Sequence, residues 1–314
     1  MRVVTITHGD DVDGLTCGAF LKRLVGGETV FANYDNLEEA LQGVEPPVDR
    51  VYICDLNLRD QLEPLLARIT GFSQLHIYDH HQMSPRLMEA LRARGASVRL
   101  ETGDCAAMLV WDSHREELGW EARRMAGYAA ISDMFEEGPI AQGVLARLDR
   151  KFTQHEAQLL THALWEDPSK EFKSMVMEHL SRFDYPHRIP GLVEKAVSFL
   201  EEMARLKELI AENACVEGRV GLMEVEGHST GVVANLIIEA LGVDVAVGYK
   251  LDDSHASLSL RGWKGLQEHL GEICMELGSR FHGFGGGHSR ASGIKVPREN
   301  LEPLLRELKK RLNP

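Results

Sequence analysis

The first hundred residues alternate short apolar runs, rich in β-branched side chains, with stretches of helical periodicity. The runs predict strands at residues 3–7, 28–32, 51–54, 75–78 and 97–100. Helices are expected at 15–24 and 59–69. Apolar strands that alternate with helices are typical of a mostly parallel sheet covered by helices on both faces. The sequence therefore predicts an N-terminal α/β domain with a doubly wound sheet.

The remainder of the chain predicts a helical segment and then a second, smaller α/β domain. Residues 104–185 favour helices without a strand. One long amphipathic helix is expected next, because apolar residues recur there at spacings of three and four. These residues are Leu192, Ala196, Phe199, Met203, Leu206 and Ile210. Beyond it, strands are predicted at 219–225, 243–249, 256–260 and 292–296, and helices at 231–241, 264–278 and 300–312. We expect a larger domain at 1–189, a connecting helix at 190–214 and a smaller domain at 215–314.

Composition limits the class of protein. With 314 residues, 44% of them hydrophobic and 26% charged, the chain is typical of a globular protein with a sizeable core. Its apolar runs are shorter than the roughly 18–20 residues of a membrane span, and the N-terminus lacks the apolar segment of a signal peptide. Five scattered cysteines without CxxC spacing are expected to be reduced. We therefore expect a cytoplasmic protein.

The formal net charge of −13 bears on the choice of partner. It argues against a broad basic face for long nucleic acid, since phosphate affinity comes from many Lys and Arg contacts. A small phosphate ligand, or one held through metal ions, remains compatible with this charge. No membrane partner is expected, and the oligomeric state is left open.

Three predicted strands are each followed directly by side chains of the kind that bind metals. These side chains are His8, Asp11 and Asp13 after the first strand, Asp55 after the third, and Asp79, His80 and His81 after the fourth. Asp133 ends a later apolar helical run. Because the carboxyl ends of parallel strands meet at one edge of a sheet, we expect these groups to lie close together.

Gathered carboxylates repel one another unless cations neutralise them. A set of His and Asp without a thiolate cluster suits Mn²⁺ or Mg²⁺. Five or six such ligands suit two ions about 3.5–4 Å apart, which clamp an in-line displacement at phosphorus and lower the pKa of the attacking water. Taken singly, an Asp after a strand is also a common helix cap, and for Asp10 this interpretation is favoured.

A second signal is a run of three glycines, Gly285, Gly286 and Gly287, followed by His288 and Arg290. Consecutive glycines expose backbone N–H groups and allow close approach of an anion, and the two basic side chains add donors. A flexible loop is the alternative interpretation. Upstream, strand alternation places Ser257, Ser259 and Arg261 on one face, where Arg261 is either a ligand contact or a solvated charge.

Together these motifs resemble those of the DHH phosphoesterase superfamily with a C-terminal DHHA1 domain. HGDDVDG at 8–14, ICDL at 53–56, YDHH at 78–81 and ISDMF at 131–135 resemble its four motifs, and GGGH at 285–288 resembles that of DHHA1. The resemblance covers roughly residues 1–135 and 216–297, and 136–190 carry no motif that we can assign. The superfamily includes RecJ-type exonucleases, nanoRNA phosphodiesterases, cyclic-dinucleotide hydrolases and family II pyrophosphatases.

The resemblance implies roles for individual residues. Asp11 would bind one ion, Asp13 the other, and Asp55 both; His8 would complete the first site, and His80 with Asp133 the second. In one common family pattern three residues separate this histidine from the first aspartate; here two do, so Asp10 is an alternative to His8. His81 resembles the histidine that faces the substrate phosphate, and Asp79 would orient its neighbours. The substrate-binding residues would be Arg261, Gly285, Gly286, Gly287, His288 and Arg290.

The expected function is hydrolysis of short oligonucleotides or linear dinucleotides to mononucleotides, with two Mn²⁺ that Mg²⁺ or Co²⁺ could replace. The cleft between the two domains would then measure substrate length. A different C-terminal domain disfavours the pyrophosphatases, and the additional domains of RecJ disfavour an enzyme for long single strands. The alternatives are a hydrolase of cyclic dinucleotides or 3′-phosphoadenosine 5′-phosphate, a RecJ-like exonuclease, a polyphosphate or inorganic phosphatase, and a non-catalytic nucleotide sensor. Exact substrate, strand polarity and the choice between RNA and DNA stay open.

Overall fold

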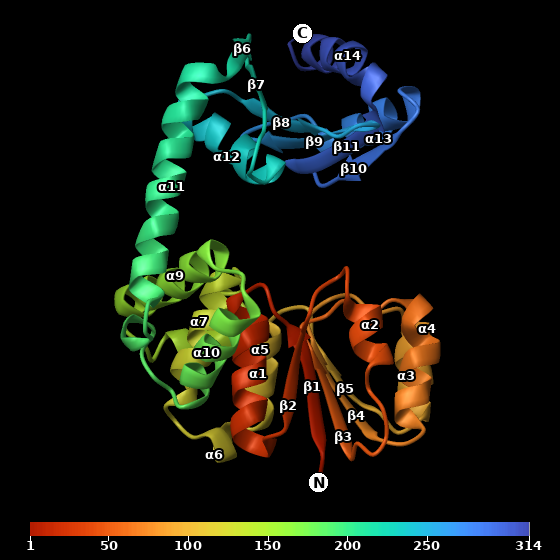
Figure 1. The fold of residues 1–314 in the computed structure, drawn as a ribbon, viewed down its shortest axis with the longest axis vertical. Coiled ribbons are helices and arrows are strands. Elements are labelled where there is room, and N and C mark those ends of the chain that lie inside the picture. Colours follow the sequence, from red (N-terminus) through yellow and green to blue (C-terminus); the bar gives the residue numbers. More distant parts are fainter. Residues whose placement is uncertain (314) are drawn as a thin grey trace. The chain divides into compact units, whose positions relative to one another are not determined.

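The computed structural model describes residues 1–313, which divide into two compact units (Figure 1). The first contains residues 1–200 and the second begins at Glu201. The division lies within the long helix α11, Leu192–Asn213. Within residues 1–313, no helix is both long and apolar enough to cross a membrane.

The N-terminal unit is built on a parallel sheet of five strands in the order β2-β1-β3-β4-β5. The strands are β1 (Val3–His8), β2 (Glu28–Ala32), β3 (Arg50–Cys54), β4 (Gln74–Asp79) and β5 (Ser97–Leu100). All five lie where the apolar runs predicted them. The α/β class with a parallel N-terminal sheet is therefore confirmed.

Helices cover both faces of this sheet (Figure 1). Tyr52 and Cys54 share one core with α1 (Val12–Val25), α5 (Ala106–Ser113) and α7 (Ala122–Ser132). Val51 and Ile53 point to the other face, where they pack with α2 (Leu37–Gln42), α3 (Glu63–Thr70) and α4 (Pro85–Ala93). Alternate side chains of β3 thus point to opposite faces of the sheet and pack in two separate apolar cores.

The segment expected to be helical contains helices and no strand between residues 104 and 185. After α5 come α6 (Arg115–Leu118), α7, α8 (Pro139–Leu145), α9 (Arg150–Glu166) and α10 (Lys170–Ser181). Short 3₁₀ turns lie at Asp60–Leu62, Pro186–Arg188 and Arg298–Asn300. Helix α10 packs against α1, which brings this segment next to the loop after β1.

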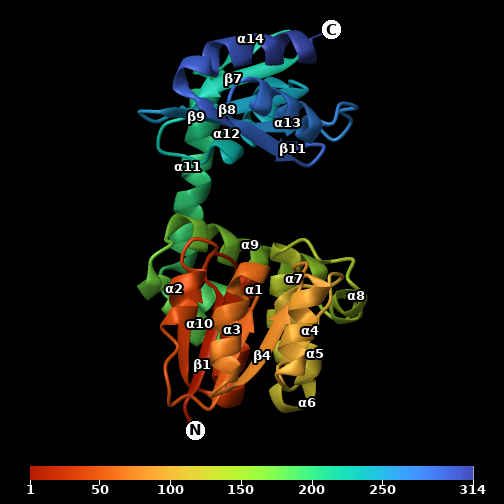
Figure 2. The ribbon, with the colours of Figure 1, turned by 90° about the vertical axis from the view of Figure 1, so that its right-hand side faces the viewer.

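The C-terminal unit is a mixed sheet of six strands in the order β10-β11-β9-β8-β7-β6. The strands are β6 (Cys215–Glu217), β7 (Val220–Glu224), β8 (Val245–Leu251), β9 (His255–Gly262), β10 (Phe284–Gly287) and β11 (Ala291–Pro297). Its helices are α12 (Thr230–Leu241), α13 (Leu270–Arg280) and α14 (Leu301–Leu312). Helices α13 and α14 pack on one face, and α12 packs on the other (Figure 2).

The structure rules out one alternative interpretation and corrects one predicted boundary in this unit. The three glycines do not form a loop: they lie in the edge strand β10, where Gly286 pairs with Gly293 and Gly287 with Ser292. Gly287 has φ +133, and a Cβ on Gly285 would lie 2.2 Å from the carbonyl oxygen of Cys274 on α13. Glycine is therefore required here for close packing of strand on helix. Helix α13 begins at Leu270 and not at 264, because His269 caps it by accepting the N–H of Glu272.

Candidate metal centre

The residues predicted as metal ligands lie together at the carboxyl edge of the N-terminal sheet. Strands β1, β3 and β4 are neighbours there, so the residues that follow them meet. Within residues 1–313, three overlapping groups present ligand atoms within 4.8 Å of one another. The groups are His8, Asp11 and Asp55; Asp13, His80 and Asp133; and Asp55, Asp79, His80 and His81.

The first group is formed by the end of β1 and the start of α1. Asp11 caps α1, and its Oδ1 accepts the N–H of Gly14 at 2.9 Å. Its other oxygen lies 2.8 Å from Nδ1 of His8. The same nitrogen of His8 lies 3.6 Å from Oδ2 of Asp55. Helix capping, an ordinary structural device, thus fixes the orientation of one candidate ligand.

The second group lies deeper. The carboxylate of Asp13 is buried and accepts the N–H groups of Ala106 and Ala107, both at 2.8 Å, at the first turn of α5. Each of its oxygens keeps a second lone pair for a cation. Asp133 caps the C-terminal end of α7, and its Oδ2 lies 3.5 Å from Nε2 of His80.

Asp55 faces both groups. Its Oδ1 lies 3.1 Å from Nε2 of His80, while its Oδ2 lies near His8 as described. Asp55 has φ +58, a left-handed conformation that aspartate tolerates better than most residues. Its own N–H donates to the carbonyl of Tyr78 at 3.0 Å, which ties the turn after β3 to β4.

Two buried carboxylate oxygens of these ligand groups, Oδ2 of Asp55 and Oδ2 of Asp133, have no hydrogen-bond partner within residues 1–313. An unpaired buried carboxylate oxygen is costly to desolvate. Oxygen and imidazole donors without sulfur fit a divalent cation of the Mn²⁺ or Mg²⁺ type. The residues present therefore fit the metal that the sequence predicted.

The protonation of the cluster agrees with this interpretation. Burial, with repulsion from Asp55 and Asp11, raises the pKa of Asp13 to about 8. Burial, with repulsion from Asp13, raises the pKa of Asp133 to about 7, and burial and Asp11 raise that of Asp55 well above its usual value. Burial opposes a charged His8, but the hydrogen bond to Asp11 and the negative charges of Asp11 and Asp55 prevail and raise the pKa of His8 to about 10. A metal-free cluster thus holds protons that a cation would displace.

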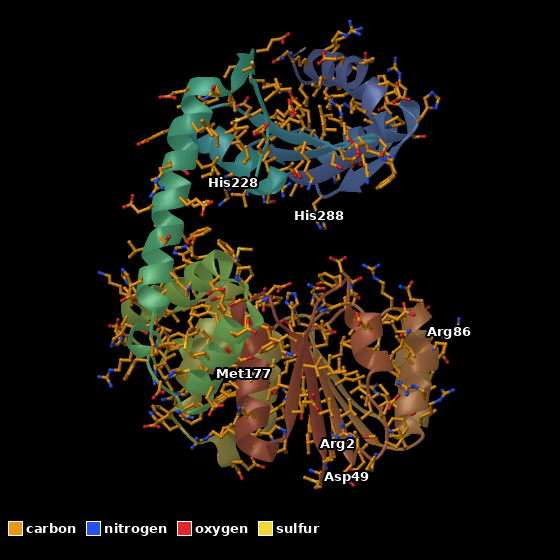
Figure 3. All side chains as sticks on the ribbon, viewed as in Figure 1. Arg2, Asp49, Arg86, Met177, His228 and His288 are labelled. Atoms are coloured by element: carbon orange, nitrogen blue, oxygen red, sulfur yellow. The ribbon has the colours of Figure 1, made fainter. Side chains whose placement is uncertain are left out.

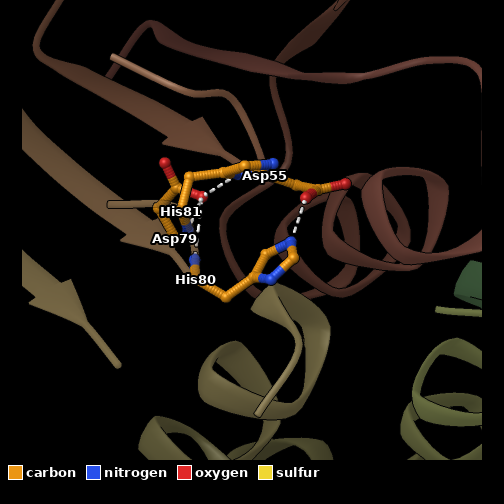
Figure 4. A group of neighbouring side chains, drawn as sticks. All are labelled: Asp55, Asp79, His80 and His81. Atoms are coloured by element: carbon orange, nitrogen blue, oxygen red, sulfur yellow. Dashed lines mark hydrogen bonds and ion pairs between the residues drawn. The ribbon is translucent and has the colours of Figure 1, made fainter. Parts of the chain in front are cut away.

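The third group contains the pair predicted to act on the substrate (Figure 4). Oδ1 of the buried Asp79 accepts the backbone N–H groups of His80 at 2.8 Å and His81 at 3.1 Å, and lies 2.7 Å from Nδ1 of His81. The hydrogen bond from Asp79 raises the pKa of His81. Asp79 therefore fixes the ring of His81 and leaves its Nε2 for another partner.

That Nε2 lies 3.2 Å from the hydroxyl of Tyr34, a residue that the sequence did not single out. Tyr34 lies in the loop after β2 and is exposed. No local motif marks it, because its partner is 47 residues away in the chain. Tyr34 is a further candidate for contact with a substrate.

The sequence left open whether Asp10 takes the place of His8 as a metal ligand. In the structure, Asp10 contacts other side chains instead. Its Oδ1 lies 2.6 Å from Nζ of Lys173 on α10, and its Oδ2 accepts from Nδ2 of Asn33 at 3.2 Å. Burial opposes ionisation, but the hydrogen bonds from Lys173 and Asn33 prevail and lower the pKa of Asp10. Asp10 lies outside the three ligand groups, whereas His8 belongs to one of them. It does not cap α1 either, since Asp11 does.

Gly14 allows α1 to start directly against β1. A Cβ at this position would lie 2.1 Å from the carbonyl oxygen of His8. We expect Gly14→Ala to lower the free energy of unfolding by roughly 1–3 kcal/mol, because the backbone of the loop must move. Gly143→Ala in α8 is the control, since a Cβ there meets no atom within 4 Å. Urea unfolding checks this; equal stability of the two variants would contradict the close approach.

In the C-terminal unit, the predicted substrate-binding residues lie at one end of the sheet. Arg261 pairs in register with Ala291, next to the turn that carries His288 and Arg290. Both of these turn residues are exposed, and His288 extends away from the sheet (Figure 3).

The guanidinium of Arg261 lies at the start of α12. A Cβ on Gly231 would lie 2.6 Å from its Nη2, and Nη1 donates to the carbonyl of Leu260 at 2.9 Å. No acidic side chain in the described part of the chain forms an ion pair with Arg261. Burial lowers the pKa of this guanidinium. Arg261 is therefore available to an anionic ligand.

Comparison with known proteins finds a family model that matches the C-terminal part of the chain. Residues 220–313 match the family model of the DHHA1 domain. They are a DHHA1 domain. Among curated proteins, an uncharacterized protein of Methanocaldococcus jannaschii is 28% identical over 99 residues, which is 30% of this chain and 30% of that protein. The match thus spans less than a third of the relative's length.

Two solved structures share the fold over nearly the whole chain. The pGpG-specific phosphodiesterase PggH from Vibrio cholerae is 14% identical, with a TM-score of 0.62 over 100% of this chain and 99% of that one. RecJ from Thermus thermophilus, solved in complex with Mn²⁺, is 17% identical, with a TM-score of 0.60 over 99% of this chain and 52% of RecJ. At these identities the likeness shows the fold. The predicted two-part α/β fold is thus confirmed, and the DHHA1 match lies in the C-terminal part of the chain, where the GGGH motif predicted it.

Proposed function

We propose that this chain is a metal-dependent phosphodiesterase that hydrolyses short oligonucleotides or linear dinucleotides to mononucleotides. The observation that carries the proposal is the position of Asp55, whose two carboxylate oxygens face two separate groups of candidate ligands. In this proposal His8, Asp11 and Asp55 hold one ion. The second ion is held by Asp13, Asp55, His80 and Asp133.

Mn²⁺ is the proposed metal, with Mg²⁺ or Co²⁺ as substitutes. RecJ from Thermus thermophilus, which shares the fold, has been solved with Mn²⁺ and with Mg²⁺. Bound divalent ions would neutralise the charge that develops on the phosphoryl oxygens and lower the pKa of the attacking water. The chain itself supplies the fixed carboxylates that place them, through the caps at Asp11 and Asp13.

His81 is proposed to donate a hydrogen bond from Nε2 to a phosphoryl oxygen. Asp79 raises the pKa of His81, so a larger fraction of the ring is protonated near neutral pH. The hydrogen bond that Nδ1 of His81 donates to Asp79 keeps the ring from rotating when substrate enters. Tyr34, which lies beside Nε2, would be displaced or would share the same phosphate.

The substrate class rests on charge and on similarity. The net charge of −13 favours a short substrate over a long polyanion. PggH, which shares the fold over the whole chain, is named for pGpG, a linear dinucleotide. RecJ also shares the fold, so a single-strand exonuclease is the second candidate, although this chain spans only 52% of it.

The decisive experiment is product analysis with Mn²⁺. The protein is incubated separately with linear pGpG, a longer single strand, a cyclic dinucleotide, 3′-phosphoadenosine 5′-phosphate and pyrophosphate. We expect fast conversion of pGpG to GMP and weak action on the long strand. His80→Ala, which loses a candidate ligand, is the contamination control and should be inactive. Preference for the long strand would favour the exonuclease, and nucleotide binding without any turnover would favour a sensor.

Arg261, His288, Arg290 and the glycines of β10 are the proposed contacts for the rest of the substrate. We expect Arg261→Ala to raise KM for pGpG roughly tenfold or more, because a charged hydrogen bond contributes about 1.5–3 kcal/mol. The Mn²⁺ dependence of turnover should stay unchanged. Arg280→Ala is the control, since Arg280 is exposed in the same unit and pairs with Glu307. Equal KM values for the two variants would remove Arg261 from the binding site.

A further inference from the structure

A pocket outside the metal centre lies in the helical part of the N-terminal unit. It has a volume of about 450 Å³ and is formed by α5, α6, α7, α8 and the loop before α7. This volume is within the range of small-molecule sites, roughly 300–1,000 Å³. Its cationic and aromatic lining residues are Trp111, Arg115, Trp120, Arg123 and Arg147.

Arg123 is an unusual residue to find in this position. It is only 4% exposed, and its Nε is buried without a hydrogen-bond partner. In the described part of the chain no carboxylate forms an ion pair with it, and its guanidinium lies over the ring of Trp120. Burial, with repulsion from Arg147, lowers the pKa of Arg123. A shielded guanidinium without a counter-charge is costly, and an anion would relieve that cost.

Two further arginines line the same pocket, while its carboxylate is already engaged. Arg115 and Arg147 are exposed, and Arg147 donates from Nη1 to the carbonyl of Gly143 at 2.7 Å. Asp112, which also lines the pocket, lies 2.7 Å from Arg99 and 3.8 Å from Arg115. The pocket thus has an excess of positive charge in a chain whose net charge is −13. Guanidinium groups bind phosphate through paired hydrogen bonds.

Two indole rings line the pocket beside these cations. Trp120 is 67% exposed, which is high for the largest apolar side chain. The Nε1 of Trp111 is buried and has no hydrogen-bond partner within residues 1–313. Flat indole faces stack nucleobases, and a free N–H can donate to a ring or phosphate acceptor. The lining therefore combines the two chemistries that a nucleotide presents.

We propose that this pocket binds a nucleoside monophosphate, with its phosphate on the arginines and its base against the tryptophans. The site is separate from the metal centre: Arg123 and Asp133 lie near opposite ends of α7, about 15 Å apart along the helix axis. Helix α5 separates the two sites in the same way. The N–H of Ala106 at its start donates to Asp13 of the metal centre, and Trp111 of the pocket lies toward its other end. Binding here would need no metal ion.

The test is tryptophan fluorescence in EDTA. The chain has four tryptophans, so a Trp165→Phe/Trp263→Phe variant keeps only the two in the pocket. We expect saturable quenching by GMP, and weaker binding of guanosine and of ribose 5-phosphate. Arg115→Ala/Arg147→Ala in that background should weaken GMP binding at least tenfold. Both residues are exposed, so these replacements are expected to fold.

Arg94→Ala, at an exposed arginine in the same unit, is the matched control and should bind GMP normally. Absence of quenching, or equal affinity in the double-arginine variant, would overturn the proposal. Inorganic phosphate that binds as tightly as GMP would overturn the assignment of the base. Because EDTA removes metal, and because Trp263 is the only tryptophan of the C-terminal unit, these results do not depend on turnover or on the DHHA1 domain.

Discussion

Replacing Asp55 with asparagine is expected to lower turnover of pGpG by roughly 10³-fold or more, since several kcal/mol of charge stabilisation depend on the bound ions. Asp55 is the residue whose oxygens face both ligand groups, so an amide there weakens both sites together. Asparagine tolerates the left-handed φ of +58 as well as aspartate does, and its size is the same. The loss should therefore come from chemistry and not from misfolding.

Two measurements separate a loss of metal binding from misfolding. Calorimetric titration with Mn²⁺ should show weaker binding in Asp55→Asn, and thermal unfolding in EDTA should show a stability at least equal to that of the wild type. The second result is expected because the variant removes a carboxyl whose ionisation in the folded state is opposed by burial and by the charges of Asp11 and Asp133. Asp35→Asn is the control, at an exposed carboxylate in the loop after β2. Turnover of pGpG by Asp55→Asn at the wild-type rate would contradict the proposed role of Asp55 as a ligand of both ions.

The parallel sheet and most of the candidate site could be predicted because both depend on local patterns. Runs such as 51–54 mark buried strands, and the residue after each strand lands at the same edge whatever the connecting segments do. His8, Asp55 and Asp79 therefore come together from strand order alone. The cap that Asp11 forms on α1 then follows from the ordinary preference of aspartate for helix starts.

Other features depend on contacts between distant residues, which no local pattern encodes. Lys173 reaches Asp10 across 163 residues, and Tyr34 reaches His81 across 47. Strand β10 is a different case, because glycine has low β-propensity and pointed to a loop. It is a strand because its backbone pairs with β11, and glycine is required there because a side chain at Gly285 would strike the carbonyl of Cys274 on α13. The structure of β10 thus depends on tertiary packing, which the low β-propensity of glycine does not reveal.

In EDTA, the free energy of unfolding is expected to fall as the pH rises from about 4 to about 8. The pKa of Asp13 is about 8 and that of Asp133 about 7 in the folded chain, and both are near 3.8 when unfolded. Between those values the folded state holds protons that the unfolded state has lost. Each such proton lowers stability by about 1.4 kcal/mol per pH unit. His8, raised from 6.5 to about 10, extends the same trend to higher pH.

Mn²⁺ should reverse this trend, because it binds the deprotonated carboxylates and neutral imidazoles that high pH supplies. The difference in unfolding free energy between the Mn²⁺ and EDTA forms should therefore widen from about pH 5.5 to about pH 8. Urea unfolding at several pH values measures it, and Asp55→Asn should show a shallower slope in EDTA. Stability in EDTA that rises over this range would mean that the carboxylates are already ionised without metal. The cluster would then be a network of ion pairs with His8 and His80, and not a metal centre.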